Sequence, residues 1–190
     1  MTLRQLIHER RDAIARSWLE ATLATYPGNS AALFAREKDP FANPVGHSLR
    51  VGTEGILDAI LAGTDAGEVR KHLHEIIKIR AIQSFTPSQA LGFVYSLKEV
   101  VRAELGEAAT DPTFTSELAA LDAQIDRIAL VAFDTYVECR QQVYELRLNE
   151  VKRQVSWVVG KMNQQDRPQL VQIQRKRSAE GGNVTREDLR

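Results

Sequence analysis

A long helical pattern between Asp111 and Met162 constrains this chain more than any other feature of its sequence. It opens with Asp111-Pro112, a helix cap followed by proline at the first helical position, and Gly and Pro are then absent until Gly160. Apolar or small residues recur at steps of mostly three and four: Leu118, Leu121, Ile125, Ile128, Ala132, Tyr136, Cys139, Val143, Leu146, Val151, Val155, Val158 and Met162. A helix of roughly 50 residues is about 75 Å long at ~1.5 Å per residue. The rest of the chain cannot cover such a helix, so we expect one part to pack in a core and the other to project toward a partner.

The sequence before this stretch also reads as helical. Apolar residues at helical spacing predict helices over 2–26, 44–62, 66–83 and 87–105, and a short one over 31–36. Alternation typical of strands does not persist for more than a few residues, so the predicted class is all-α with a long projecting C-terminal helix. The apolar pattern decays after Met162, which predicts a flexible tail.

Two local features carry further expectations. Thr86-Pro87 followed by Gln89 is typical of a helix start, because the threonine and glutamine can cap each other's backbone N–H groups. Gly52 and Gly55 are unfavourable inside a helix, at about 1 kcal/mol each against alanine. We therefore expect a neighbouring helix to approach them closely.

Composition limits the classes of function. The chain has 190 residues, of which 43% are hydrophobic, and 25 basic residues balance 25 acidic residues. This balance argues against nucleic-acid binding, which usually needs a basic surface. The single cysteine excludes an internal disulfide and fits a reducing compartment. Neither a secretory signal nor an apolar run long enough for membrane insertion is present, so the expected location is cytoplasmic.

The sequence offers little that indicates reaction chemistry. It contains no phosphate loop, nucleophile elbow or paired metal-binding motif, and we expect no enzyme activity and no cofactor. His72 and His74 are two positions apart and point to opposite sides of a helix, so they do not chelate one metal ion. Cys139 lies on the apolar seam of the long helix and reads as a small core residue. A haem-binding sensor is an alternative, and its best ligand would be His72.

Two charged residues stand out because their surroundings are apolar. Arg80 lies among isoleucines, and Asp134 lies in a segment that is apolar nearly all round the helix. A buried charge must be paired or hydrogen-bonded, because an isolated ion costs several kcal/mol. One interpretation is a structural arginine–carboxylate pair, or side chains that reach the surface. The other is a polar anchor in a ligand pocket or a switchable contact at a dimer interface.

The long helix carries both charge signs on its second half. Arg147, Glu150 and Arg153 are three apart and can bridge along one face. This face is either simply solvated or the polar flank of a two-helix seam. The interface predicted for dimerisation and signal relay consists of Tyr136, Cys139, Arg140, Val143, Leu146, Arg147 and Glu150.

Three stretches together resemble the N-terminal sensor domain of the RsbR/RsbRD co-antagonist family of bacterial stressosomes. They are Glu37-Lys38-Asp39-Pro40-Phe41-Ala42-Asn43-Pro44-Val45-Gly46, Ile79-Arg80-Ala81-Ile82-Gln83-Ser84-Phe85-Thr86-Pro87-Ser88-Gln89-Ala90, and Ala132-Phe133-Asp134-Thr135-Tyr136 through Arg140 to Arg147-Leu148-Asn149-Glu150-Val151. The resemblance covers roughly residues 5–150. It implies a globin-like, haem-free fold with a role in stress signalling, a homodimer formed through the last helices, and a long helix that passes a signal to a C-terminal STAS domain.

The residues after Met162 are too few for a STAS domain, so the resemblance implies a sensor that acts on a separate partner protein. We expect a globin-like sensor domain over 1–150, the projecting end of the long helix over 151–165 and a flexible tail over 166–190. The expected function is a non-catalytic sensory or regulatory module that relays a signal through its last helix, as a coiled coil. An accessory or assembly subunit of a larger respiratory complex is the alternative from another class.

Overall fold

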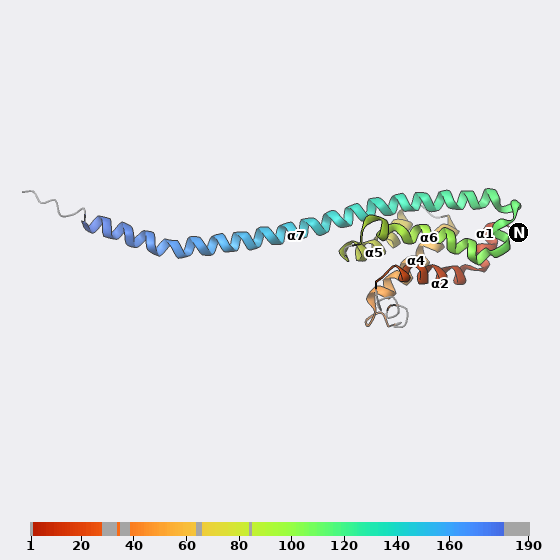
Figure 1. Ribbon diagram of the computed structural model, residues 1–190, viewed down its shortest axis with the longest axis horizontal. Helices are drawn as coiled ribbons and strands as arrows, with labels where there is room; N and C mark the ends of the chain where they lie inside the picture. The colour runs from red at the N-terminus through yellow and green to blue at the C-terminus, as the bar shows by residue number, and fades with distance from the viewer. Residues whose placement is uncertain (1, 28–33, 35–38, 64–65, 84, 181–190) are drawn as a thin grey trace, which may run out of the picture. The chain divides into compact units, whose positions relative to one another are not determined.

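The computed structural model describes residues 2–27, 34, 39–63, 66–83 and 85–180, of which 66 and 163–180 are described by their backbone alone. All elements in these ranges are helical, which confirms the predicted all-α class with a long C-terminal helix (Figure 1). They are α1 (Leu3–Glu9), α2 (Arg11–Ala24), α4 (Pro44–Ala62), α5 (Ala66–Ile82), α6 (Pro87–Leu105), the 3₁₀ turns η1 (Gly106–Thr110) and η2 (Pro112–Phe114), and α7 (Thr115–Glu180).

The helix starts follow the capping signals in the sequence. The Thr86 hydroxyl accepts a hydrogen bond from the Gln89 backbone N–H, and the Gln89 side chain accepts one from Thr86 in return. Asn43 caps α4 by accepting from the Gly46 backbone N–H, with Pro44 at the first helical position. The predicted helix over 31–36 lies outside the described residues except for Phe34.

The prediction of one helix over 2–26 is wrong, because the chain breaks between α1 and α2 at Arg10. The apolar period lapses there: Ile7 and Ile14 are buried, whereas Arg10 and Arg11 between them face other partners. Arg10 donates a hydrogen bond to the Glu104 carbonyl, and Arg11 forms an ion pair with Asp58 at 2.7 Å.

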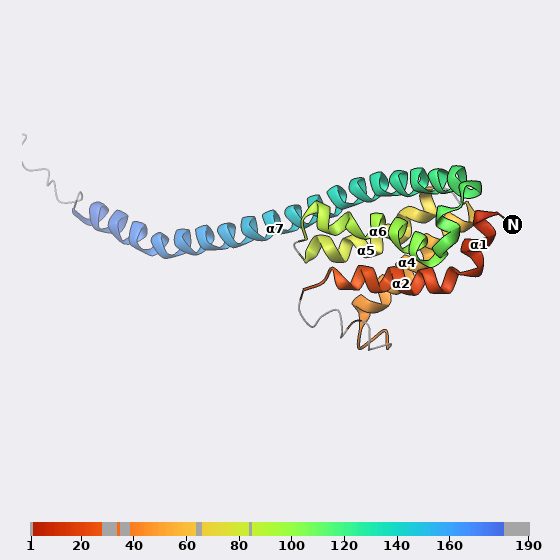
Figure 2. The ribbon, with the colours of Figure 1, turned by 45° about the vertical axis from the view of Figure 1, so that its right-hand side comes forward.

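The core lies among α2, α4, α5, α6 and the first part of α7. Helix α2 contacts α4 and α6, and α4 contacts α5. The first part of α7 runs beside α6, as Figures 1 and 2 both show, and ion pairs join the two helices: Lys98 with Asp126 at 2.6 Å and Arg102 with Asp122 at 2.5 Å. Large side chains with no exposed surface fill the space between these helices: Trp18, Leu49, Leu73, Ile76, Phe93, Leu97 and Ile125.

Helix α7 is divided between two units of the chain. Contacts divide the chain into Met1–Val143 and Tyr144–Arg190. Helix α7 continues to Glu180, whereas the sequence pattern predicted its end near Met162, where the apolar period stops and Pro168 follows. Residues 163–180 contain many good helix formers, such as Gln, Lys, Arg and Leu, and these continue the backbone pattern without an apolar face. None of the described helices has the length and apolar character that crossing a lipid bilayer requires.

Helices α4 and α5 approach closely at two glycines, as the sequence predicted. A Cβ atom on Gly52 would lie 2.6 Å from the Ile76 side chain, and one on Gly55 would lie 2.3 Å from the His72 ring. Both distances are well inside van der Waals contact. A larger residue at Gly52 would clash with Ile76 and would also lie 3.3 Å from the His72 carbonyl, whereas one at Gly55 would require the half-buried His72 ring to move.

We expect Gly52→Ala to lower the free energy of unfolding by about 1–2 kcal/mol, because Ile76 is fully buried and cannot move aside. Urea denaturation of the full chain measures this change. Gly92→Ala in α6 is the matched control: nothing lies within 4 Å of the added Cβ, so helix propensity should stabilise it by about 0.5–1 kcal/mol. A stabilised Gly52→Ala variant would contradict the close approach.

Candidate functional site

The most unusual side chain in the first unit is the fully buried Arg80 at the C-terminal end of α5. Its guanidinium carbon lies 5.1 Å from the ring centre of Tyr26, 5.2 Å from that of Phe85 and 5.0 Å from that of Phe93. Aromatic faces attract a cation through their quadrupole, and this attraction is stronger away from water. We call Arg80 with these three rings the arginine cage.

Hydrogen bonds hold the guanidinium within the cage. Nη1 donates to the Gln89 carbonyl at 3.0 Å, and Nη2 donates to the Thr22 carbonyl at 3.1 Å and to the Thr25 hydroxyl at 3.0 Å. Thr22 lies in the last turn of α2 and Thr25 is its C-cap, where free carbonyls give the helix its negative end. The partner of the buried charge is therefore a helix C-terminus, in place of the carboxylate that the sequence analysis considered.

Among the described residues, two buried polar atoms of the cage, Arg80 Nε and the Tyr26 hydroxyl, form no hydrogen bond of normal geometry, although Arg80 and Tyr26 interact electrostatically with each other. Burial lowers the pKa of Arg80, whereas the adjacent Tyr26 opposes that shift. Burial likewise raises the pKa of Tyr26, and the positive charge of Arg80 works against the rise. An arginine remains protonated even so, and the cage therefore holds a desolvated cation with spare donor capacity.

Asp134 does not belong to this site, and the expectation that it is buried is wrong. Its side chain is exposed on α7, as are those of Leu130, Phe133 and Val137 around it. The apolar segment that surrounds Asp134 is thus covered only on the side that faces the core. The apolar residues on the other side are available for contacts outside the chain.

Helix α7 is hydrogen-bonded to the end of α5 and to the turn between α5 and α6, beside the arginine cage. The Tyr136 hydroxyl donates to the Phe85 carbonyl at 2.7 Å, and Arg140 Nη1 donates to the Ala81 carbonyl at 2.8 Å. Ala81 adjoins Arg80, and Phe85 supplies one of the cage rings. These two bonds join the cage to the last buried turns of α7, close to the end of the first unit at Val143.

The stretches that carry the family resemblance meet here. Asn43, from the first, donates to the Phe34 carbonyl at 2.8 Å, and the Phe34 ring packs edge-on against Tyr26 at 5.4 Å. The second stretch supplies Arg80 and Phe85, and the third supplies Tyr136 and Arg140. Residues that are distant in the sequence therefore converge on one turn.

A second, shallower site lies between α5 and α7. A surface depression of about 450 Å³ is lined by Gly67, Arg70, Lys71, His72, His74, Glu75, Thr135 and Glu138. Beside it the Cys139 sulfur lies 3.8 Å from His74 Nδ1. Burial raises the pKa of the Cys139 thiol, and the negative charge of Glu138 raises it further, so the sulfur stays a thiol and is a poor nucleophile.

This depression does not assemble a metal site, because no group of three suitable side chains comes together in the described ranges. His72, the residue considered for haem, packs its ring against Gly55 of α4.

The residues predicted for dimerisation and relay fall into two groups. Tyr136 and Cys139 are buried in the core of the first unit, and Arg140 and Val143 are half-buried. Leu146, Arg147 and Glu150 belong to the second unit and are exposed. Tyr136 and Cys139 are thus occupied by contacts within the chain, Arg140 and Val143 remain partly accessible, and the second group is fully available to a partner.

We expect Arg80→Met to lower the free energy of unfolding by about 2–3 kcal/mol, because it removes the hydrogen bonds that the buried guanidinium donates to Thr22, Thr25 and Gln89 together with its contacts to the three aromatic rings. Methionine keeps the length and apolar contacts of the side chain, so the loss reports the hydrogen bonds and the charge. Urea denaturation measures it, with the exposed Arg16→Met on α2 as control, for which we expect a change within about 0.5 kcal/mol. An Arg80→Met variant with the same free energy of unfolding as the parent would show that the cage does not stabilise the fold.

Comparison with known proteins agrees with this convergence of motifs. The family model described as the RsbT co-antagonist protein rsbRD N-terminal domain matches residues 12–151. This range includes the arginine cage, both bonds to α7 and all three stretches identified in the sequence. No curated protein sequence and no solved structure matches the chain. The chain belongs to the rsbRD N-terminal domain family of regulatory domains.

Proposed function

We propose that this chain is a non-catalytic sensory module in which the packing of the arginine cage sets the position of α7. The observation that supports this most directly is the pair of hydrogen bonds from Tyr136 and Arg140 to the turn that carries Arg80. A change at the cage moves the carbonyls of Ala81 and Phe85, and α7 follows because its last buried turns are bonded to them. The signal then passes along α7 to residues of the second unit.

The cage has the properties of a switchable element. Its cation is held by carbonyls, a hydroxyl and aromatic faces, all of which are weaker partners than a carboxylate. Arg80 Nε and the Tyr26 hydroxyl still have unused hydrogen-bonding capacity. A ligand or a neighbouring segment that offers an acceptor to these atoms would stabilise one arrangement of the turn over another.

We further propose that the module is a homodimer joined through the outward face of α7 in the first unit. Leu130, Phe133 and Val137 are exposed there at steps of three and four, and exposed apolar side chains grouped at this spacing are typical of helix–helix interfaces. On the neighbouring α6, Tyr95 is exposed as well, beside the Lys98 that pairs with Asp126. Such a dimer would set the two cages on either side of one shared pair of helices.

The output would be received by a separate protein. The matching family is named for a co-antagonist of RsbT, and by analogy this chain would act in a regulatory assembly of that kind. Residues 1–143 would sense, and the helix from Tyr144 onward would transmit.

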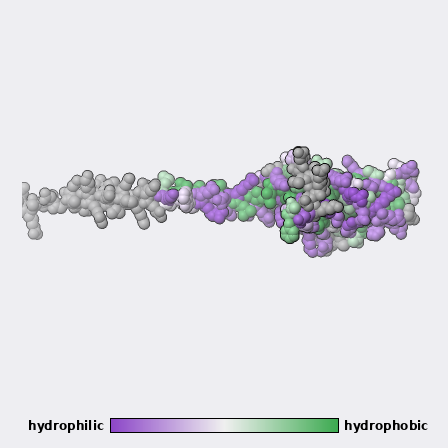
Figure 3. All heavy atoms as spheres, turned by 90° about the horizontal axis from the view of Figure 1, so that it is seen from below, coloured by the Kyte–Doolittle hydropathy of each residue, from purple (hydrophilic) through white to green (hydrophobic). Residues whose placement is uncertain are grey.

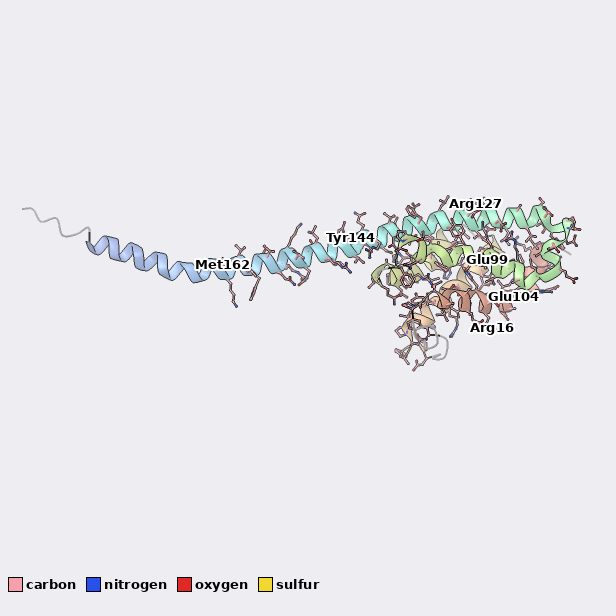
Figure 4. All side chains as sticks on the ribbon, viewed as in Figure 1. Arg16, Glu99, Glu104, Arg127, Tyr144 and Met162 are labelled. Carbon is pink, nitrogen blue, oxygen red and sulfur yellow. The ribbon has the colours of Figure 1, made fainter. Side chains whose placement is uncertain are left out.

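We expect light scattering coupled to size exclusion to give the mass of a dimer for the full chain, and of a monomer for Phe133→Glu, because a carboxylate at the centre of the face opposes its burial. Arg16→Glu places a carboxylate on the exposed side of α2, with a larger change in net charge than Phe133→Glu, and should leave the dimer intact (Figure 4). A folded parent chain that is monomeric at every concentration would overturn the dimer. A dimer that survives Phe133→Glu would place its interface elsewhere.

A further inference from the structure

The described side chains of the second unit have no core of their own. Every side chain from Tyr144 to Met162 is exposed, and several of them are large and apolar (Figure 4 labels both ends). Figure 3 shows hydrophobic atoms, in green, interspersed with hydrophilic atoms on the surface of this helix. Isolated helices gain little stability from propensity alone, so this helix needs a partner to bury its apolar side chains.

Six of these apolar residues follow a coiled-coil repeat, whereas exposed Leu146 and Trp157 lie outside it. Tyr144, Leu148, Val151, Val155, Val158 and Met162 are separated by steps that alternate strictly between four and three. This spacing fixes the heptad register: Leu148, Val155 and Met162 at position a, and Tyr144, Val151 and Val158 at position d. All six side chains are exposed, and we call them the apolar seam.

The composition of the seam does not favour a two-stranded parallel pair of identical helices. Two-stranded parallel coiled coils prefer β-branched residues at a and leucine at d, whereas here Leu148 occupies an a position and Val151 and Val158 occupy d positions. Val159 at position e is also exposed and widens the apolar surface beyond a and d. The seam is therefore less suited to a two-stranded parallel pair than to packing against more than one helix, although Val155 at position a fits the two-stranded pattern.

The charges beside the seam also oppose self-pairing. In a parallel pair, Arg147 at position g would face Lys152 at position e of the other copy. In an antiparallel pair that matches every a position with a d position, Arg147 would face Lys161 of the other copy. Lys152 would face Lys152 of the other copy. Both arrangements thus place like charges together over this segment, and e and g charges decide which partners a coiled coil accepts.

We propose that residues 144–162 bind an amphipathic helix of a different protein, one that carries Asp or Glu on both sides of its own apolar seam. Arg147, Lys152 and Lys161 supply the complementary positive charges. Acidic Glu150 does not cancel them, because it lies at position c and pairs with Arg153 at position f, away from the seam. Glu145 at position e is acidic and lies beside the seam, so the positive charge of the flanks is concentrated after it, from Arg147 to Lys161. This inference rests on the proposed relay to a partner protein and names the chemistry of the surface that the relay would reach.

The test uses two synthetic three-heptad peptides with Leu at a and d, one with Glu and one with Lys at every e and g position. Each is labelled and titrated with the full chain, and binding is followed by fluorescence anisotropy. We expect the Glu peptide to bind at least tenfold more tightly than the Lys peptide, with an affinity that falls as salt rises. Equal affinities, or preference for the Lys peptide, would overturn the proposal.

Substitutions locate the effect on the chain. The combined variant Arg147→Glu, Lys152→Glu and Lys161→Glu should reverse the preference, whereas Arg153→Glu at position f should leave the ratio of affinities within about twofold. Val151→Glu with Val158→Glu should abolish binding of both peptides. If the triple variant still prefers the Glu peptide, Arg147, Lys152 and Lys161 do not determine the charge preference, and their proposed role is overturned.

The outcomes separate this inference from the proposed function. If both peptides bind alike and the valine substitutions abolish binding, the helix still transmits but its charge preference is disproved. If neither peptide binds and the valine substitutions reduce the mass of the parent assembly, the seam is a contact between copies of this chain, which overturns the inference. If neither peptide binds and the mass is unchanged, transmission through this helix fails as well.

Discussion

The first unit depends on a buried guanidinium, that of Arg80, which has no carboxylate partner among the residues that the structure describes. Arg80 comes from α5, its hydrogen-bond acceptors come from the end of α2 and the start of α6, and its aromatic neighbours come from α6 and the loops beside it. A cation removed from water needs compensation from every direction, so none of these segments can shift alone. The cost of burying the charge thereby fixes the mutual position of three helices.

Helix α7 is coupled to this arrangement at only a few points near the end of the core. Tyr136 and Arg140 bond to the turn that carries the cage, and from Tyr144 onward the described side chains are exposed. A helix transmits a displacement along its length because its backbone hydrogen bonds resist local bending. The division of α7 between a buried part and an exposed part is compatible with the proposed relay, in which the core would set one part and a partner would bind the other.

Much of this fold could be predicted from the sequence, because helix caps and apolar periods are local signals. Thr86 and Asn43 identified two helix starts, and the glycines at 52 and 55 correctly indicated a close helix pair. The break at Arg10 was missed because it involves neither Gly nor Pro, and only a lapse in the apolar period marks it. The extension of α7 past Met162 was missed because the prediction relied on an apolar face that this part of the helix lacks.

The candidate site was only partly predictable. The isoleucines around Arg80 indicated an apolar environment and left a side chain that reaches the surface as an alternative, and its aromatic neighbours Tyr26 and Phe93 are far away in the sequence. Asp134 was misjudged because a continuous apolar run does not distinguish a helix buried on all sides from one that is covered on one side and open to a partner on the other. The globin-like character and the dimer came from the family resemblance and remain predictions.

Hydrogen exchange on the backbone amides of α7, with and without Arg80→Met, tests the coupling most directly. Both proteins are compared under conditions in which each is folded, with Arg16→Met as control. If the cage holds α7 through Tyr136 and Arg140, the variant should lose protection over residues 136–143, while residues 118–128, which pack against α6 away from the turn, keep theirs. Unchanged protection over 136–143, or an equal loss along the whole buried part of α7, would contradict the account.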